Sequence, residues 1–165
     1  MSARLEGIIL RKKIWHDNDL LLSVFSLSEG RIKLVQPRGF KKTRAELDLF
    51  CRSEFIVSDN KDFALIYQTS GLDLFSQIRQ DYTLLQAAAE AVQTIEKITS
   101  SLQPNPELYQ LLLDYLRTFK TGSTAAELTQ RKTLWQQNIL RSEGIYSGQK
   151  ISEKSFWQTI EAYRG

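Results

Sequence analysis

The first seventy residues alternate between short apolar runs and polar breaks, a pattern typical of β-strands joined by turns. The apolar runs lie at 7–15, 20–27, 31–35, 55–57 and 63–67. Within 31–35 every second residue is apolar, so we expect Ile32 and Leu34 to face a core and Arg31 and Lys33 to face solvent. Five short strands in this length predict a small closed or nearly closed barrel, SH3-like or of the OB type.

After Gly71 the apolar period changes to that of helices. One stripe recurs at spacings of four and three residues, at Leu84, Ala88, Ala91, Ile95 and Ile98. Asn105 followed by Pro106 predicts an N-cap and first helical position. The remaining helical faces comprise Leu108, Leu111, Leu112, Tyr115 and Phe119, then Leu128, Trp135 and Ile139, and finally 152–163. The chain is therefore expected to be α+β, with a small β-barrel over 1–72 and an α-helical bundle over 73–165.

Composition places the chain among folded proteins, because 42% of its 165 residues are apolar and 10% are aromatic. Cys51 is the single cysteine, which excludes a disulfide framework or a cysteine zinc cage within the chain. The sequence contains no apolar run of roughly 20 residues and no signal-peptide core at its start. These features predict a soluble, cytoplasmic protein of a reducing compartment.

Charge is divided unevenly along the chain, although the net charge is only +3. Residues 1–44 contain ten Lys and Arg against four Asp and Glu, whereas 45–165 contain twelve against fifteen. This asymmetry favours a polyanionic partner for the first part, and a protein partner or plain solvation for the second.

The strongest candidate for a binding site is the stretch from Arg31 to Arg44, which carries six cations and no acidic residue. Gly39 allows the backbone to bend there, and the aromatic ring of Phe40 is suited to stacking on bases. A solvated, Lys-rich edge loop is the alternative interpretation. The predicted nucleic-acid-binding residues are Arg11, Lys12, Lys13, Trp15, Arg31, Lys33, Arg38, Phe40, Lys41, Lys42 and Arg44.

These residues form one groove if the strand with Arg31 and Lys33 neighbours the strand with 11–13. Phosphates would then run along the cations, with Trp15 or Phe40 stacked on bases. Packing at the barrel rim is the competing role for Trp15. No residue pattern indicates a reader of base edges, so we expect sequence-tolerant, salt-dependent binding.

Other reactive residue types have simpler explanations. His16 lies in a polar turn together with Asp17 and Asp19, whose composition explains them without a magnesium ion. Cys51 is expected to pack rather than to act as a nucleophile. We therefore predict no cofactor, no metal and no catalytic residue. In the helical part, Arg131 with Lys132, or Lys97 with Arg79, offers positive charge for an acidic peptide tail, or belongs to a solvated helix face.

Several motifs follow one another in a fixed order. They are Glu6–Arg11, Asp19–Leu22, Ser28–Arg31, Val35–Thr43, Leu111–Leu116 and the segment from Trp135 through Ile139 and Leu140 to Gly144. This ordered set, with its glycine-centred basic loop after the third strand, resembles the family of the bacterial recombination mediator RecO over nearly the whole chain.

The resemblance implies an OB-fold followed by a helical domain. It also implies a non-enzymatic protein of the bacterial cytoplasm and nucleoid that binds single- and double-stranded DNA, anneals strands and helps to load recombinase onto DNA. The implied partners are RecR and the acidic C-terminal tail of single-strand-binding protein. Many relatives carry a cysteine-ligated zinc module after the position of Gly144. Residues 145–165 contain no cysteine, so the chain resembles a short, zinc-free member.

The sequence is compatible with two other classes of function. An RNA-binding barrel protein of translation or RNA processing would need the same cations and aromatic rings. A metal-dependent hydrolase would use Asp17, Asp19 and Glu29. A purely protein-binding adaptor would leave the basic stretch unexplained.

Overall fold

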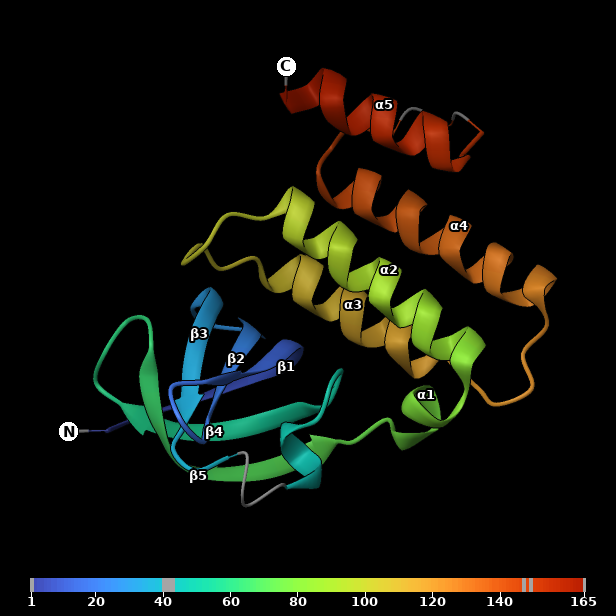
Figure 1. Cartoon of the computed structure of the whole chain (residues 1–165). Coiled ribbons are helices and arrows are strands. Elements are labelled where there is room, and N and C mark those ends of the chain that lie inside the picture. Colours follow the sequence, from blue (N-terminus) through green and yellow to red (C-terminus); the bar gives the residue numbers. More distant parts are fainter. Residues whose placement is uncertain (1, 40–43, 147, 149, 165) are drawn as a thin grey trace.

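The computed structural model describes residues 2–39, 44–146, 148 and 150–164. The predicted site residues Phe40, Lys41 and Lys42 lie outside the described residues. The described strands are β1 (Ser2–Trp15), β2 (Asp19–Ser26), β3 (Gly30–Gln36), β4 (Arg52–Ser58) and β5 (Ala64–Asp73), with the 3₁₀-helix η1 (Ala45–Leu47) before β4. Helices follow the strands, so the predicted α+β class and the order of barrel and helices are confirmed (Figure 1).

The strands close into a barrel in the order β1-β2-β3-β5-β4. All neighbours are antiparallel except β3 and β5, which pair in parallel at Leu34 and Val35. A closed five-stranded barrel of this kind is an OB-fold. The expectation that the strand with Arg31 and Lys33 neighbours the strand with 11–13 is wrong, because β2 lies between β1 and β3.

Alternate side chains of the strands fill the barrel interior, as the period of two requires. Ile32 and Leu34 both belong to this interior, which confirms their predicted direction. The other interior residues are Ile9, Leu22, Val24, Leu47, Cys51, Phe55, Val57, Ala64 and Ile66. β1 and β5 are longer than their apolar runs, because the polar segments 2–6 and 68–73 are held by pairing with β4.

A β-bulge at Leu10 changes which side chains of β1 point outward. Ile9 pairs with Val24 and Arg11 pairs with Ser23, so Leu10 has no partner of its own on β2. Ile9 faces the interior, whereas Leu10 packs outside the barrel. Two consecutive residues, Leu10 and Arg11, therefore lie on the outer side.

The helices are α1 (Ser76–Gln80), α2 (Tyr82–Ile98), α3 (Pro106–Arg117), α4 (Ala125–Ser142) and α5 (Glu153–Arg164). The predicted start at Asn105 is confirmed, since its side-chain oxygen accepts a 3.1 Å hydrogen bond from the Leu108 amide. Thr124 and Glu127 form a capping box at the start of α4. No helix in the described part of the chain is both long and apolar enough to cross a membrane.

A second hydrophobic core joins the barrel to the helices. Ile8, Leu10 and Phe25 contribute to it from the outside of the barrel, together with apolar residues of α2, α3, α4 and α5. The ring of Phe25 lies 5.9 Å from that of Tyr109 on α3. Figure 1 shows the helices stacked over one side of the barrel, with β5 on the side away from them.

A polar network crosses the same junction. Tyr109 donates a 2.7 Å hydrogen bond to Glu6 of β1, and Arg52 pairs with Glu6 at 3.0 Å and with Asp73 at 2.6 Å. Arg117 of α3 reaches Asp73 at 3.4 Å. Burial raises the pKa of the Tyr109 hydroxyl, and its bond to the Glu6 carboxylate raises it further. The network therefore connects three strands to α3.

Candidate nucleic-acid interface

The outer surface of the barrel has two parts, which we call the covered face and the open face. The covered face lies beneath the helices and comprises Ile8, Leu10, Arg11, Phe25 and Arg31. The open face lies where β1 ends and β5 begins, and it comprises Lys13, Trp15, Arg38, Phe63, Leu65 and Tyr67. The cations that the sequence grouped together are divided between these two faces.

Strand register places the residues of the open face. Lys13 pairs with Leu21, Leu21 with Val35, and Val35 with Leu65, which forms one row across β1, β2, β3 and β5. Directly paired residues point to the same side of a sheet, so all four side chains are on the outside. Trp15, two residues after Lys13, points to that side as well.

Two loops meet at the edge of the open face. Trp15 begins the β1–β2 turn, and its ring lies 5.6 Å from that of Phe63, which ends the β4–β5 loop. His16 packs on Trp15 with ring centroids 4.1 Å apart. Arg38 is anchored beside them by its backbone amide, which donates a 3.0 Å bond to Asp19. The loops after β1 and β4 are those that OB-folds use to bind oligonucleotides.

On the covered face, Arg11 is committed to a carboxylate of α2. Its guanidinium donates to both oxygens of Glu96, with the shortest distances at 2.7 and 2.8 Å. These hydrogen bonds, with the charges of Arg31 and Lys33, hold the pKa of the Glu96 carboxyl below its ordinary value although partial burial opposes this. The same bonds raise the pKa of Arg11.

Arg31 and Lys12 also have partners within the chain. Arg31 donates from Nε to the Thr99 hydroxyl at 2.6 Å and from Nη2 to the Thr99 carbonyl at 2.8 Å, so it fastens β3 to the end of α2. This differs from the solvent-facing position expected for it, because α2 covers this part of β3. Lys12 pairs with Asp48 at 2.6 Å.

Three of the predicted cations, unlike Arg11, Arg31 and Lys12, have side chains without such a partner in the described part of the chain. Among the described residues, the side chains of Lys13, Arg38 and Arg44 have no ion-pair or hydrogen-bond partner, and all three are exposed. Lys33 lies at the border of the two faces. It is half-buried and contributes to the low pKa of Glu96, and its backbone amide donates to Asp62.

Three residues of the open face were not among the predicted site residues: Phe63, Leu65 and Tyr67. The signal was present in the sequence, because 63–67 is apolar at all five positions. A barrel interior accepts only alternate residues of a strand, so either Ala64 and Ile66 or their larger neighbours had to lie outside. The structure places Ala64 and Ile66 inside.

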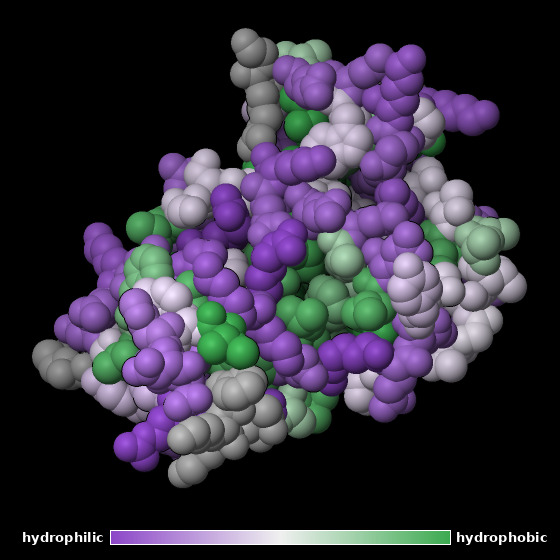
Figure 2. All heavy atoms as spheres, in the orientation of Figure 1, coloured by the Kyte–Doolittle hydropathy of each residue, from purple (hydrophilic) through white to green (hydrophobic). Residues whose placement is uncertain are grey.

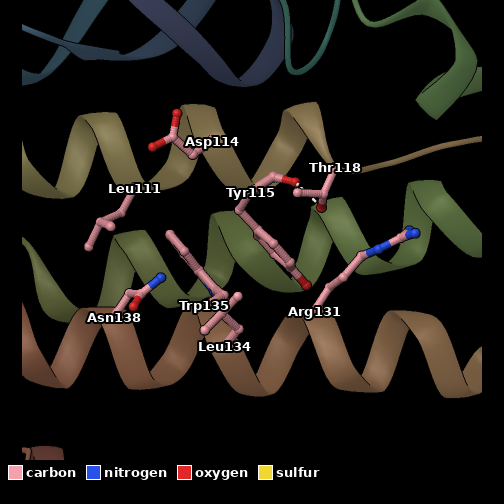
Figure 3. Close-up of a pocket in the computed structure, with 8 residues that line it drawn as sticks. All are labelled: Leu111, Asp114, Tyr115, Thr118, Arg131, Leu134, Trp135 and Asn138. Carbon is pink, nitrogen blue, oxygen red and sulfur yellow. Dashed lines mark hydrogen bonds between the residues drawn. The ribbon is translucent and has the colours of Figure 1, made fainter.

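In the helical part, an apolar pocket of about 120 Å³ lies between α3 and α4 (Figure 3). Tyr115 and Trp135 stack face to face in its wall, with ring centroids 4.9 Å apart. Arg131 lines it as well and is held by Ser123 at 2.9 Å and by Glu127 at 3.3 Å. Asp114 lines it too, so the pocket combines an aromatic wall with one positive and one negative charge.

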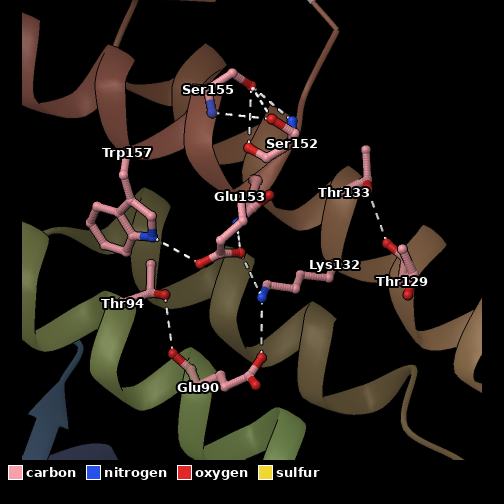
Figure 4. A network of polar contacts seen from close by, with 10 residues as sticks. Glu90, Thr94, Thr129, Lys132, Thr133, Ser152, Glu153, Ser155 and Trp157 are labelled. Carbon is pink, nitrogen blue, oxygen red and sulfur yellow. Dashed lines mark hydrogen bonds and ion pairs between the residues drawn. The ribbon is translucent and has the colours of Figure 1, made fainter.

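Lys132, on the next position of α4, is the centre of a polar network that joins three helices (Figure 4). Its ammonium lies 2.6 Å from Glu153 of α5 and 3.1 Å from Glu90 of α2. Burial would lower the pKa of Lys132, but the hydrogen bonds to the two carboxylates raise it. Trp157 donates to Glu153 at 2.9 Å, so Lys132 holds α5 in place.

A second hollow, of about 200 Å³, separates β1 from α2. Figure 2 shows hydrophobic atoms exposed between the barrel and the helices. Arg11 and Lys12 line the hollow together with Leu10, Phe50 and Val92. Since both cations already pair with carboxylates, the hollow adds no free charge to the open face.

The described part of the chain holds no group of three or more His, Cys, Asp or Glu side chains placed to bind a metal ion. Cys51 is buried in the barrel interior, and burial raises the pKa of its thiol. Asp19 is occupied by the Arg38 amide. The chemistry of the open face is therefore that of positive charge and exposed rings.

Residues 1–75 match the family model of the recombination protein O N-terminal domain. The chain is 29% identical over 145 residues to the DNA repair protein RecO of Listeria monocytogenes, covering 86% of this chain and 55% of that protein. It is 29% identical over 129 residues to that of Pelotomaculum thermopropionicum, covering 76% and 50%. For the protein of Desulforamulus reducens the identity is 27% over 124 residues, covering 73% and 48%. The chain spans about half the length of the relatives that it matches.

Proposed function

We propose that this chain, which belongs to the RecO family of DNA repair proteins, binds single- and double-stranded DNA and anneals complementary strands without a chemical step. One observation carries the proposal. The segment that matches the RecO N-terminal domain is the OB barrel, and the open face of that barrel presents exposed cations beside aromatic rings.

Annealing by such a surface follows from charge and geometry. Lys13 and Arg38 of the open face neutralise phosphates and so reduce the repulsion between two strands. The exposed Arg44 adds a further cation. Arg11 and Arg31 contribute less, because their guanidinium groups already bind Glu96 and Thr99. Lys41 and Lys42 extend the cationic set in the sequence. Binding is expected to be independent of sequence and to weaken steeply with salt.

We further propose a division of work between 1–72, which binds nucleic acid, and 73–165, which meets protein partners. In this role the chain acts as a recombination mediator, loading recombinase together with RecR onto DNA coated by single-strand-binding protein. For the acidic C-terminal tail of single-strand-binding protein, the pocket between α3 and α4 offers apolar side chains and the guanidinium of Arg131. Arg131 is paired with Glu127, and Asp114 lines the same pocket, so apolar contacts would contribute most of the binding.

The test is the annealing of two labelled complementary oligonucleotides by the purified protein, over a range of salt concentrations, with and without single-strand-binding protein and a chelator. We expect acceleration that fades with salt and survives chelation. Strands that are bound but not annealed, together with tighter binding of a matched RNA, would favour the RNA-binding alternative.

The matched variant is the triple substitution R38E, K41E and K42E. It reverses the charge of Arg38 on the open face and of Lys41 and Lys42, which lie three and four positions later in the sequence. We expect loss of both binding and annealing. Unchanged affinity in the triple variant would refute a DNA site at this position.

A further inference from the structure

We propose that the strip formed by Phe63, just before β5, and by Leu65 and Tyr67 on β5 is the surface on which the unpaired bases of a single DNA strand stack. The inference rests on the proposed function and deepens it, since it says which part of the DNA the open face contacts. Bases of a duplex are paired inside the helix, so the strip is a site for single strands.

Exposure of these three side chains is the first observation. Phe63 is 46% exposed, Leu65 41% and Tyr67 61%, although large apolar residues of a barrel are normally buried. Leu65 and Tyr67 alternate with the buried Ala64 and Ile66, which places them on the outer side of β5, and Phe63 directly precedes this strand. Tyr67 lies at a register shift, because Ile66 pairs with Val57 and Gln68 with Ile56. Leu65 and Tyr67 are two residue steps apart, at about 3.4 Å for each step. The strip is therefore a row of separate contact points rather than one compact patch.

The conformation of Phe63 is the second observation. Its φ is 54°, in the left-handed region that bulky residues rarely occupy. Its ring lies 5.6 Å from that of Trp15, and the residue remains 46% exposed. A hydrophobic residue in a strained conformation that exposes its ring indicates a role in binding.

The positive charges around the strip favour a polyanion as its ligand. Lys13 and Leu65 belong to one row across the sheet, and the exposed residues Arg38 and Lys61 lie in loops at its edge. The nearby Asp62 accepts bonds from the amides of Lys33 and Phe63. An apolar protein partner would leave the surrounding cations without counter-charges, whereas a single strand supplies phosphates for the cations and bases for the rings.

The experiment compares three ligands of equal length, about 15 nucleotides, near the upper end of the roughly 4–16 that one OB-fold binds. They are an oligothymidine, an abasic oligonucleotide that has phosphates without bases, and a duplex. We expect the full chain to bind oligothymidine about tenfold more tightly than the abasic strand, as loss of one stacked base predicts.

Two variants isolate the strip. Tyr67→Ala removes the most exposed ring, and Tyr82→Ala is the matched control, because Tyr82 is 76% exposed at the start of α2, away from the barrel face. Tyr67→Ala is expected to lose most of the preference for oligothymidine and to keep its affinity for the abasic strand. Tyr67→Phe, which retains the ring, is expected to keep the preference, as is Tyr82→Ala.

The outcomes separate this inference from the proposed function. Equal affinity for oligothymidine, abasic strand and duplex would overturn the stacking strip while leaving charge-driven DNA binding intact. A preference that Tyr67→Ala does not reduce, even when Phe63→Ala and Leu65→Ala are added, would also overturn it. Absence of binding to all three ligands at low salt would overturn both.

Discussion

The covered face and the open face of the barrel share β1, and each combines cations with apolar side chains. On the covered face, Arg11 and Arg31 bind Glu96 and Thr99 of the helical part. On the open face, Lys13 and Arg38 have no such partner among the described residues. Sequence neighbours as close as Arg11 and Lys13 thus have different roles. A count of cations measures the charge of a segment but not the charge available to a ligand.

The largest expected difference between the two faces is in stability. Phe25 is fully buried between β2 and α3, so Phe25→Ala should lower the free energy of unfolding by about 3–5 kcal/mol. Tyr67→Ala on the open face should lower it by less than about 0.5 kcal/mol. Urea denaturation of both variants measures this. A similar loss of stability in both variants would show that β5 depends on the exposed ring of Tyr67. The two faces would then not differ in their contribution to stability.

The next effect is on DNA affinity. The double substitution K13A and R38A should weaken binding of a single strand by roughly tenfold or more and reduce the salt slope by about 0.7 for each phosphate that is no longer neutralised. Arg11→Ala should change affinity less, because its charge is already neutralised by Glu96. Titrations of the variants with a labelled single strand at several salt concentrations compare these affinities. Lys120→Ala, at an exposed position of the helical part, is the control. A larger effect of Arg11→Ala would mean that DNA displaces Glu96.

The smallest effect concerns pH. The pKa of Glu96 is lowered in the folded chain, so its contribution to the free energy of unfolding is present above the ordinary value of about 4.3 and is lost as pH falls through the folded-state pKa. Arg11 is 57% exposed, which limits the contribution to less than about 1 kcal/mol. Glu96→Gln should therefore be less stable than the parent chain at about pH 7, and the difference should shrink as pH falls below the ordinary pKa of a Glu carboxyl. A stability difference between the two proteins that does not change with pH would show that packing of the side chain, and not its charge, causes the effect.

Much of the fold could be predicted from the residues themselves. The period of two placed Ile32 and Leu34 in the barrel, and the change of period after Gly71 predicted the helices. Asn105 with Pro106 marked the start of α3. Each of these signals depends only on residues that are close in the sequence, so it can be recognised without knowing which strands pair.

The candidate site was less predictable, because its composition depends on distant contacts. Arg11 meets Glu96, 85 positions away, and no pattern within the segment around Arg11 indicates that partner. The position of β2 between β1 and β3 is likewise a property of topology. Whether Lys13 and Arg38 bind DNA stays a prediction, and so does the role of Phe40, Lys41 and Lys42.

The bulge at Leu10 has a consequence for how this protein can vary among organisms and in the laboratory. It sets the outward direction of Lys13 and Trp15, because an unbroken alternation from Ile9 would turn both side chains into the barrel. Deletion of Leu10 would restore a regular ladder in which Arg11 follows Ile9 opposite Ser23, and would leave Lys13 and Trp15 outward. The segment from Ile9 to Trp15 is thus one residue longer than regular pairing needs, and a variant without Leu10 would measure what its apolar contact with the helices adds to stability.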